Sequence, residues 1–230
     1  IDAVSHGEHP SAEVTAPFQR VLNFFALDIA TQTLQALNAR DNFRQSTYDK
    51  LQLIELLHQD PDMNQDGRPD LNLDKLGYYG LSLGGIMGVE FLSLEPRMDL
   101  GVLAVPGARL VSVLTDGSVI GDFKAAIYAL VGGKEVFDGL TPLAQVILDA
   151  ADPGTYAPYL LGDRRTWTTG SDTASPPHLL MQMSINDEVV PNSSNAALAR
   201  GINLPHLRTI ATPIPMLQTL DGPLSLNHDE

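Results

Sequence analysis

The chain has 230 residues, 43% hydrophobic and 18% charged, a composition typical of a globular protein with a sizeable core. Its 28 acidic and 14 basic side chains give a formal net charge of −14, which disfavours nucleic-acid partners and anionic membrane surfaces. The lack of cysteine excludes disulfides, thiolate catalysis and cysteine-ligated metals, and no apolar run reaches the roughly 18 residues that span a bilayer. We therefore expect a single domain over residues 1–230.

The first third of the chain is expected to be mainly helical. Residues 1–4 resemble the end of a strand, so we expect the first strands of the fold to precede them. A mixed apolar pattern over 21–37 predicts one or two helices. A clearer apolar stripe over 43–57 predicts the next helix, with Lys50 among the charged residues off that stripe.

An alternation of strands and helices follows. After an acidic loop without periodicity over 60–70, a short strand is expected at 76–79, then a glycine-rich turn and a helix over about 83–94. The apolar run at 100–105, bounded by glycine and proline, predicts a buried strand. Strand, turn, helix and strand in this order indicate an α/β fold with a parallel sheet.

Residues 107–176 interrupt this alternation and are too long for an ordinary crossover. We interpret them as a largely helical cap inserted over the carboxyl edge of the sheet. The alternation resumes with a strand at 178–185 and a helix at 192–200, which Gly201 is expected to end. A last strand is expected near 214–220. The predicted fold is a mostly parallel, doubly wound sheet with a helical cap.

The strongest chemical signal is the run Gly80-Leu81-Ser82-Leu83-Gly84, followed by Gly85, between an apolar strand and an apolar helix. A serine hydroxyl raised above a sheet edge needs a sharp, strained turn, and side chains at the flanking glycines would collide with the neighbouring strand and helix. The same turn would point the N–H of Leu83 at a developing oxyanion. Ser82 is the predicted nucleophile; the alternative is a plain glycine-rich turn.

A nucleophilic serine needs a base, and an acid to orient the base. Asp187 comes first after the predicted strand at 178–185 and is the predicted acid, with Glu188 as a weaker substitute. The alternative for Asp187 is a solvated acid that caps the following helix.

Two histidines lie beyond Asp187 in the sequence. His206 precedes the last predicted strand and is expected to be structural. His228 is in the right order for the base, although it lies two residues from the end of the given sequence. Either His228 is the base, or the base lies beyond residue 230.

These residues resemble those of the α/β-hydrolase superfamily, in particular bacterial secreted lipases and esterases. The resemblance implies a Ser-His-Asp triad of Ser82, His228 and Asp187, with the N–H of Leu83 as one oxyanion donor and no cofactor for the chemistry. The family's other oxyanion donor lies on a loop after an earlier strand, which we expect to be missing from this chain. The resemblance also implies an extracytoplasmic location, secreted or in the cell envelope. It is carried by Asp2-Ala3-Val4-Ser5-His6-Gly7, Asp41-Asn42-Phe43-Arg44-Gln45, the run from Gly80 to Gly85, and Asp152-Pro153.

The acidic loop has the alternating oxygen spacing of an EF-hand calcium loop. Leu73 occupies the twelfth position, where a bidentate glutamate is usual, so the match is partial. A structural calcium ion and an acidic hairpin without metal are both open. The candidate ligands are the side chains of Asp62, Asn64, Asp66 and Asp70 and the carbonyl of Arg68.

The function predicted from the sequence is hydrolysis of carboxylic esters, either small molecules or lipids, through an acyl-enzyme intermediate. An acyltransferase or a peptidase with the same triad is the enzymatic alternative. A non-catalytic hydrolase-fold module that binds calcium or another protein is the alternative from a different class.

Overall fold

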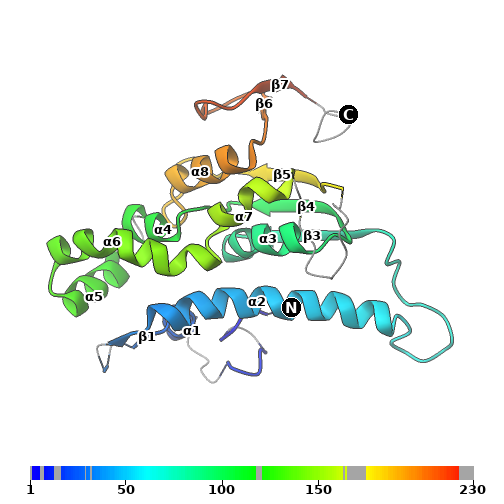
Figure 1. The fold of residues 1–230 in the computed structure, drawn as a ribbon, viewed down its shortest axis with the longest axis horizontal. Coiled ribbons are helices and arrows are strands. Elements are labelled where there is room, and N and C mark those ends of the chain that lie inside the picture. The colour runs from blue at the N-terminus through cyan, green and yellow to red at the C-terminus, as the bar shows by residue number, and fades with distance from the viewer. Residues whose placement is uncertain are drawn as a thin grey trace.

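At the centre of the protein lies a parallel three-stranded sheet in the order β3-β4-β5 (Figure 1). Its strands are β3 (Leu76–Leu81), β4 (Met98–Ala104) and β5 (His178–Gln182). The chain is therefore a mixed α/β protein with a parallel sheet, as the sequence predicts. The computed structural model describes residues 2–5, 8–12, 17–28, 30–31, 33–117, 121–162, 164 and 175–222.

The three strands end level with one another. Leu81 is paired with Ala104, and Ala104 with Gln182, so the segments that follow all leave the same carboxyl edge. The N–H of Val105 donates to the carbonyl of Gln182 at 2.8 Å and extends the contact between β4 and β5 past the last ladder pair. Loops at this edge of a parallel sheet are where α/β proteins bind ligands.

Helices cover one face of the sheet. Helix α3 (Leu83–Leu94) packs on β3 and β4, helix α2 (Ala36–Gln59) lies beside α3, and α7 (Pro153–Leu160) packs between α3 and α8 (Asn192–Ile202). The shared core is apolar and almost fully buried. It includes Val89, Phe91, Leu92, Leu103, Ala157, Leu160, Leu179 and Leu198.

The other face of the sheet carries exposed apolar side chains. Tyr79 is 67% exposed, Leu100 51% and Leu180 44%. Right-handed crossovers that run from β3 to β4 to β5 in one direction place every connecting helix on the same face. A doubly wound sheet needs helices on both faces, and the described residues provide this layer on one face alone.

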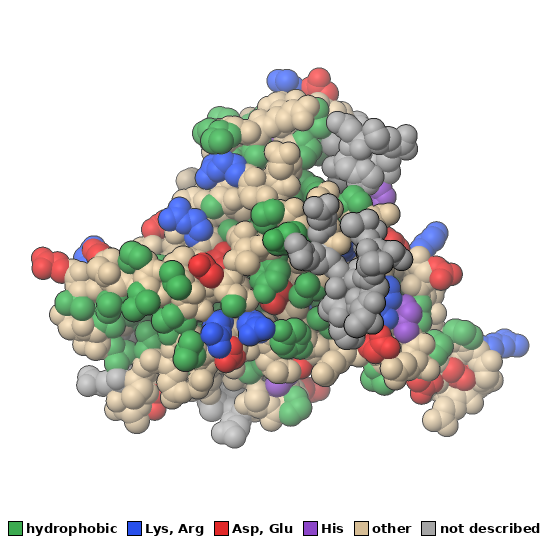
Figure 2. Space-filling model, viewed as in Figure 1, with side chains coloured by type: hydrophobic (Ala, Val, Ile, Leu, Met, Phe, Trp, Pro, Cys, Tyr) green, Lys and Arg blue, Asp and Glu red, His purple; other side chains and the backbone are tan. Residues whose placement is uncertain are grey.

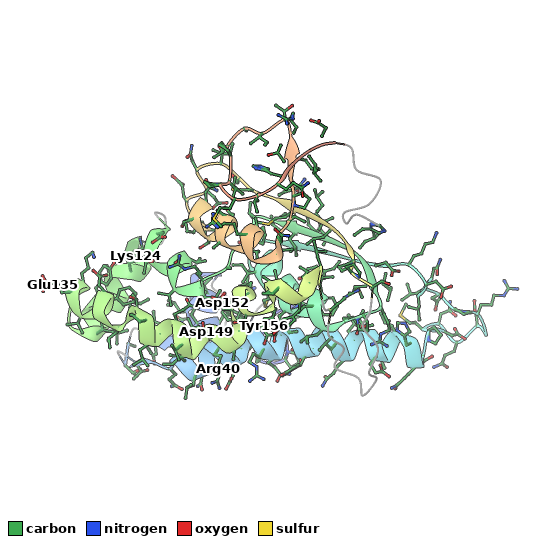
Figure 3. The ribbon with its side chains drawn as sticks, turned by 45° about the horizontal axis from the view of Figure 1, so that its top comes forward. Arg40, Lys124, Glu135, Asp149, Asp152 and Tyr156 are labelled. Carbon is green, nitrogen blue, oxygen red and sulfur yellow. The ribbon has the colours of Figure 1, made fainter. Side chains whose placement is uncertain are left out.

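The expected cap at 107–176 is only partly a cap. Helices α4 (Leu110–Asp116), α5 (Gly121–Val131) and α6 (Lys134–Leu148) extend from the carboxyl edge of the sheet (Figure 1), and a 3-10 turn, η1 (Asp149–Ala151), follows α6. Helix α7 instead belongs to the layer that packs on α3. The buried carboxylate of Asp152, labelled in Figure 3, connects α7 with the helices at the carboxyl edge. It accepts the N–H of Gly154 in α7, the N–H groups of Arg109 and Leu110 at the start of α4, and the side-chain amide of Gln145 in α6.

The ends of the described chain differ from expectation. Of the one or two helices predicted over 21–37, only the end of α1 (Pro17–Phe24) and the first residues of α2 are present, and a small antiparallel pair, β1 (Leu27–Asp28) and β2 (Thr33–Leu34), lies between them. The Asp28 carboxylate accepts the N–H groups of two of the next three residues and so favours a turn over a helix. Near the C-terminus, β6 (His206–Arg208) and β7 (Thr219–Asp221) form a separate parallel pair.

Candidate active site

Ser82 has the backbone of a strained turn between strand and helix. Its φ is 52° and its ψ is −115°, a conformation that side-chain-bearing residues rarely adopt. The Ser82 N–H donates to the carbonyl of Ala104 at 2.9 Å, and its carbonyl accepts the N–H of Ile86 at 2.9 Å. Strain of this kind costs about 1–3 kcal/mol and is concentrated at functional sites.

The glycines around Ser82 have different roles. A Cβ on Gly80 would lie 2.4 Å from the carbonyl oxygen of Gly84, and one on Gly85 would lie 2.8 Å from that of Ala104. A Cβ on Gly84 would meet only the Tyr78 hydroxyl, at 3.9 Å. The predicted collision is therefore confirmed for Gly80 and wrong for Gly84. The second tight position is Gly85, where α3 crosses the end of β4.

A side chain from β3 holds the first turn of α3 in place. The hydroxyl of Tyr78 donates to the carbonyl of Gly84 at 2.7 Å, and burial raises the pKa of Tyr78 to about 12, so the phenol remains a neutral donor at physiological pH. Leu83 is the first residue of this helix, and its N–H is one of the first-turn groups that have no acceptor within the helix. Such N–H groups, together with the helix dipole, favour negative charge beside Ser82.

Asp187 lies on the loop between β5 and α8. Its Oδ1 accepts the N–H groups of Val189 and Val190, each at 2.9 Å. Asn192, in the first turn of α8, accepts the N–H of Asn186 at 2.8 Å and so anchors this loop. The N-cap of α8 is Pro191, so Asp187 does not cap that helix.

The structure places Ser82 and Asp187 at the same edge of the sheet. Ser82 follows β3 and Asp187 follows β5, with β4 between the two strands. Neighbouring strands lie about 4.8 Å apart, so roughly 10 Å separates the strand axes that lead to the two residues. A histidine side chain between them would have a hydrogen-bond partner on each side.

The predicted base, His228, lies outside the described residues. His206 precedes the last strand, β7, as the sequence predicts, but it also lies at the start of a short strand of its own, β6, where its N–H donates to the carbonyl of Gln218 at 2.7 Å. The β6–β7 pair lies beyond β5, on the side of the sheet away from β3 (Figure 1). This position agrees with a structural role for His206.

Residues 3–5 lie beside the helix that follows Ser82. Ala3 and buried Val4 pack in one cluster with Leu83, Ile86 and Met87. The N–H of Val4 donates to the Ser46 hydroxyl and that of Ser5 to the Ser11 hydroxyl, so these two N–H groups already have partners. This segment therefore lies next to the turn at Ser82, which we call the elbow. That the loop with the other oxyanion donor is missing from the chain stays a prediction. His6 and Gly7 lie outside the described residues.

Lys50 is a buried residue that sequence reasoning missed. It is 7% exposed, and its Nζ donates to the carbonyl of Ser46 at 2.7 Å. Burial lowers the pKa of Lys50 to about 8, although the nearby carboxylates of Asp49 and Glu90 act in the opposite direction. Lys50 lines a cavity of about 510 Å³ between α2 and β3. The sequence does contain a signal for this burial. Lys50 follows buried Phe43 by seven residues, which is two helical turns, and so lies on the same face of α2.

The candidate calcium loop folds on itself. The Asp62 carboxylate accepts the N–H groups of Asp66 and Gly67, Asp66 accepts that of Arg68, and Asp70 accepts both the N–H and the side-chain amide of Asn64. Over the described part of the chain, no group of three or more His, Cys, Asp or Glu side chains is arranged to hold a metal ion. The loop therefore has the turn geometry that Asp and Asn favour, and calcium binding stays a prediction.

Comparisons of this chain with protein-family models, with curated proteins and with solved structures found no match. Within the described ranges, no helix is both long and apolar enough to cross a membrane. The case for a function therefore depends on the local geometry of the site.

Proposed function

We propose that this protein is a serine hydrolase that cleaves carboxylic esters, with Ser82 as its nucleophile. The observation that carries the proposal is the backbone of Ser82, with φ 52° and ψ −115° between the end of β3 and the first turn of α3. This strained turn puts a side chain at the carboxyl edge of a parallel sheet and beside free helix N–H groups, as acyl-transfer chemistry requires. Under the proposal the fold is an α/β-hydrolase fold.

In the proposed mechanism, Oγ of Ser82 attacks the ester carbonyl carbon and loses its proton to a histidine. His228 is the proposed base because it follows Asp187 in the chain. One oxygen of Asp187 accepts backbone N–H groups, and the other would accept Nδ1–H of the base and stabilise the imidazolium. The N–H of Leu83 would donate to the tetrahedral oxyanion. The histidine then protonates the leaving alcohol, and water releases the acid in a second attack.

The proposed substrates are uncharged acyl esters, small or lipid-like. Helix α6 beside the carboxyl edge carries apolar side chains, and the formal net charge of −14 disfavours anionic substrates such as phosphoesters. No redox or transfer cofactor is proposed for this chemistry.

Hydrolysis of p-nitrophenyl esters of increasing acyl length tests the proposal. We expect wild type to release p-nitrophenolate and Ser82→Ala to fall to the uncatalysed rate, with an unchanged circular dichroism spectrum. Ser184→Ala, an exposed serine near Asp187, is the matched control and should keep wild-type activity. Activity that survives Ser82→Ala would refute Ser82 as the nucleophile. Faster product formation with added alcohols or amines than with water would instead identify an acyltransferase.

A further inference from the structure

Helix α6 exposes a line of large apolar side chains. Val136 is 48% exposed, Leu140 41%, Leu143 57% and Val146 67%. The spacing of four and then three residues places Val136, Leu140 and Leu143 on one side of the helix, with Val146 next to them. Figure 2 shows hydrophobic side chains gathered at this end of the molecule, over α5 and α6. We call these four residues the α6 stripe.

The apolar part of α6 is wider than the packing of the domain uses. Phe137, Ala144 and Leu148 face the neighbouring helices, and the stripe adjoins them on the solvent side. A helix at the surface of a globular protein normally has polar residues in that position. An apolar arc of this width indicates that the solvent side of α6 also contacts an apolar surface, in addition to the contact on its buried side.

The C-terminal part of α6 belongs to the same buried cluster as the helix turn that follows Ser82. Leu148 and Ala144 pack in one cluster with Leu83 and Ile86, which belong to the first turn after Ser82. The stripe lies on the solvent side of the same helix. Leu143 and Val146, close to Ala144 and Leu148 in the sequence, are thus the part of the stripe nearest to the helix turn that follows Ser82.

We propose that the α6 stripe docks the protein on a zwitterionic phospholipid surface. A second copy of the chain is the less favoured occupant, because a stable protein interface buries about 800 Å² per partner over 20–30 residues, far more than four side chains of one helix provide. A helix that rests on a lipid surface needs only a strip of apolar side chains to enter the acyl region.

The charges around the stripe determine the kind of lipid. Glu135 and Asp149 flank it and are exposed, and Lys134 is already paired with Asp138 (Glu135 and Asp149 are labelled in Figure 3). With a formal net charge of −14, the protein has no electrostatic attraction to anionic lipid. The stripe therefore fits a surface without net charge, and adding anionic lipid should weaken binding.

The test is co-sedimentation of the full chain with phosphatidylcholine vesicles. Every protein carries Ser82→Ala, so the lipid stays intact and binding is measured without the proposed catalytic step. Leu140→Gln/Leu143→Gln removes the centre of the stripe, and Leu56→Gln, at an exposed leucine (59%) on α2, is the matched control. We expect the double variant to bind at least about tenfold more weakly and the control to bind as before.

A second measurement places the contact. Leu143→Trp should show a blue shift in tryptophan emission when vesicles are added, and Leu56→Trp should not, after subtraction of the signal of the single native tryptophan. Equal binding by the double variant, or no vesicle binding by the parent protein, would overturn the proposal. A dimer in light scattering that the double variant dissociates would assign the stripe to self-association instead. The inference rests on the proposed function only in what the docking would serve. Binding to vesicles does not require Ser82 to be reactive, so the two proposals can fail separately.

Discussion

Ser82 and Asp187 leave the same edge of the sheet, from two parallel strands that have one strand between them. The backbone of Ser82 is fixed by its hydrogen bond to Ala104 at the end of the middle strand, and the Asp187 loop is anchored on Asn192. Residues about 100 positions apart in the chain are thereby positioned by one rigid sheet. Because the sheet positions both residues, a substitution where α3 packs against the end of β4 should disturb the geometry of the site more than a substitution on an exposed loop.

The two adjacent glycines Gly84 and Gly85 should respond in opposite ways to alanine. Gly85→Ala would place a Cβ 2.8 Å from the carbonyl oxygen of Ala104, so α3 would have to shift, at a cost of about 1–3 kcal/mol and most of the esterase activity. Gly84→Ala has room for its Cβ and should be neutral or slightly stabilising in a helix. Urea unfolding and ester hydrolysis of both variants check this. Equal loss in both would contradict the packing described for the elbow.

Arg164 should be essential for stability and not replaceable by lysine. Its buried guanidinium donates to five carbonyl oxygens, four around the end of α3 and the start of β4 and one ahead of β5, and burial lowers its pKa to about 10. Lysine lacks the planar fork that makes these bonds. We expect Arg164→Lys to lose about 3 kcal/mol or more of unfolding free energy. Arg200→Lys, at an exposed arginine, should change it by less than about 0.5 kcal/mol. The accepting carbonyls belong to Leu92, Glu95, Pro96, Met98 and Ser175.

Local signals in the sequence were sufficient for the elements that form the elbow. The helix expected over about 83–94 is α3, Leu83–Leu94, because the glycine turn fixes its start and Pro96 disfavours its continuation. The prediction that Gly201 ends the helix is wrong. Helix α8 continues to Ile202 and is capped by Asn203 with φ 60°. A Cβ on Gly201 would lie 3.0 Å from that of Ala157, so the glycine allows α8 to approach α7 closely.

Other features depend on tertiary contacts that a single sequence does not contain. The burial of Lys50 could have been found from its position on the face of Phe43, but charge alone suggested solvent. The approach of Val4 to Leu83 and Ile86 joins segments about 80 residues apart, and no local pattern encodes that distance. The base of the triad stays a prediction because His228 lies outside the described residues, and calcium binding stays a prediction because the loop's carboxylates accept hydrogen bonds from the loop itself.

Lys50 should make stability depend on pH above neutrality. Its folded pKa of about 8 lies below the ordinary lysine value of about 10.4, so between these values the unfolded chain binds more protons. Stability from Lys50 therefore rises with pH across this window. Relative to Lys50→Met, wild type should gain roughly 2 kcal/mol between pH 7.5 and 9.5. Urea unfolding of both proteins at both pH values tests this. A pH-independent difference would show that the amine is not buried as described.

Calcium binding at the acidic loop has a direct thermal test. If Asp62 and Asp66 bind the ion, millimolar calcium chloride should raise the Tm by a few degrees, whereas Asp62→Ala/Asp66→Ala should show no response. Magnesium at the same concentration serves as the control, because it prefers a tighter octahedral site. An unchanged wild-type Tm would mean that the loop is an acidic turn without metal.

The central claim is that Ser82 is an activated nucleophile, and covalent labelling by a fluorophosphonate, mapped by peptide mass spectrometry, tests it most directly. The account predicts a single adduct on Ser82 that is absent from Ser82→Ala and strongly slowed in Asp187→Asn, in which the base would lose its orienting carboxylate. Folded protein that takes up no label, or an adduct on another serine that persists in Ser82→Ala, would contradict the claim.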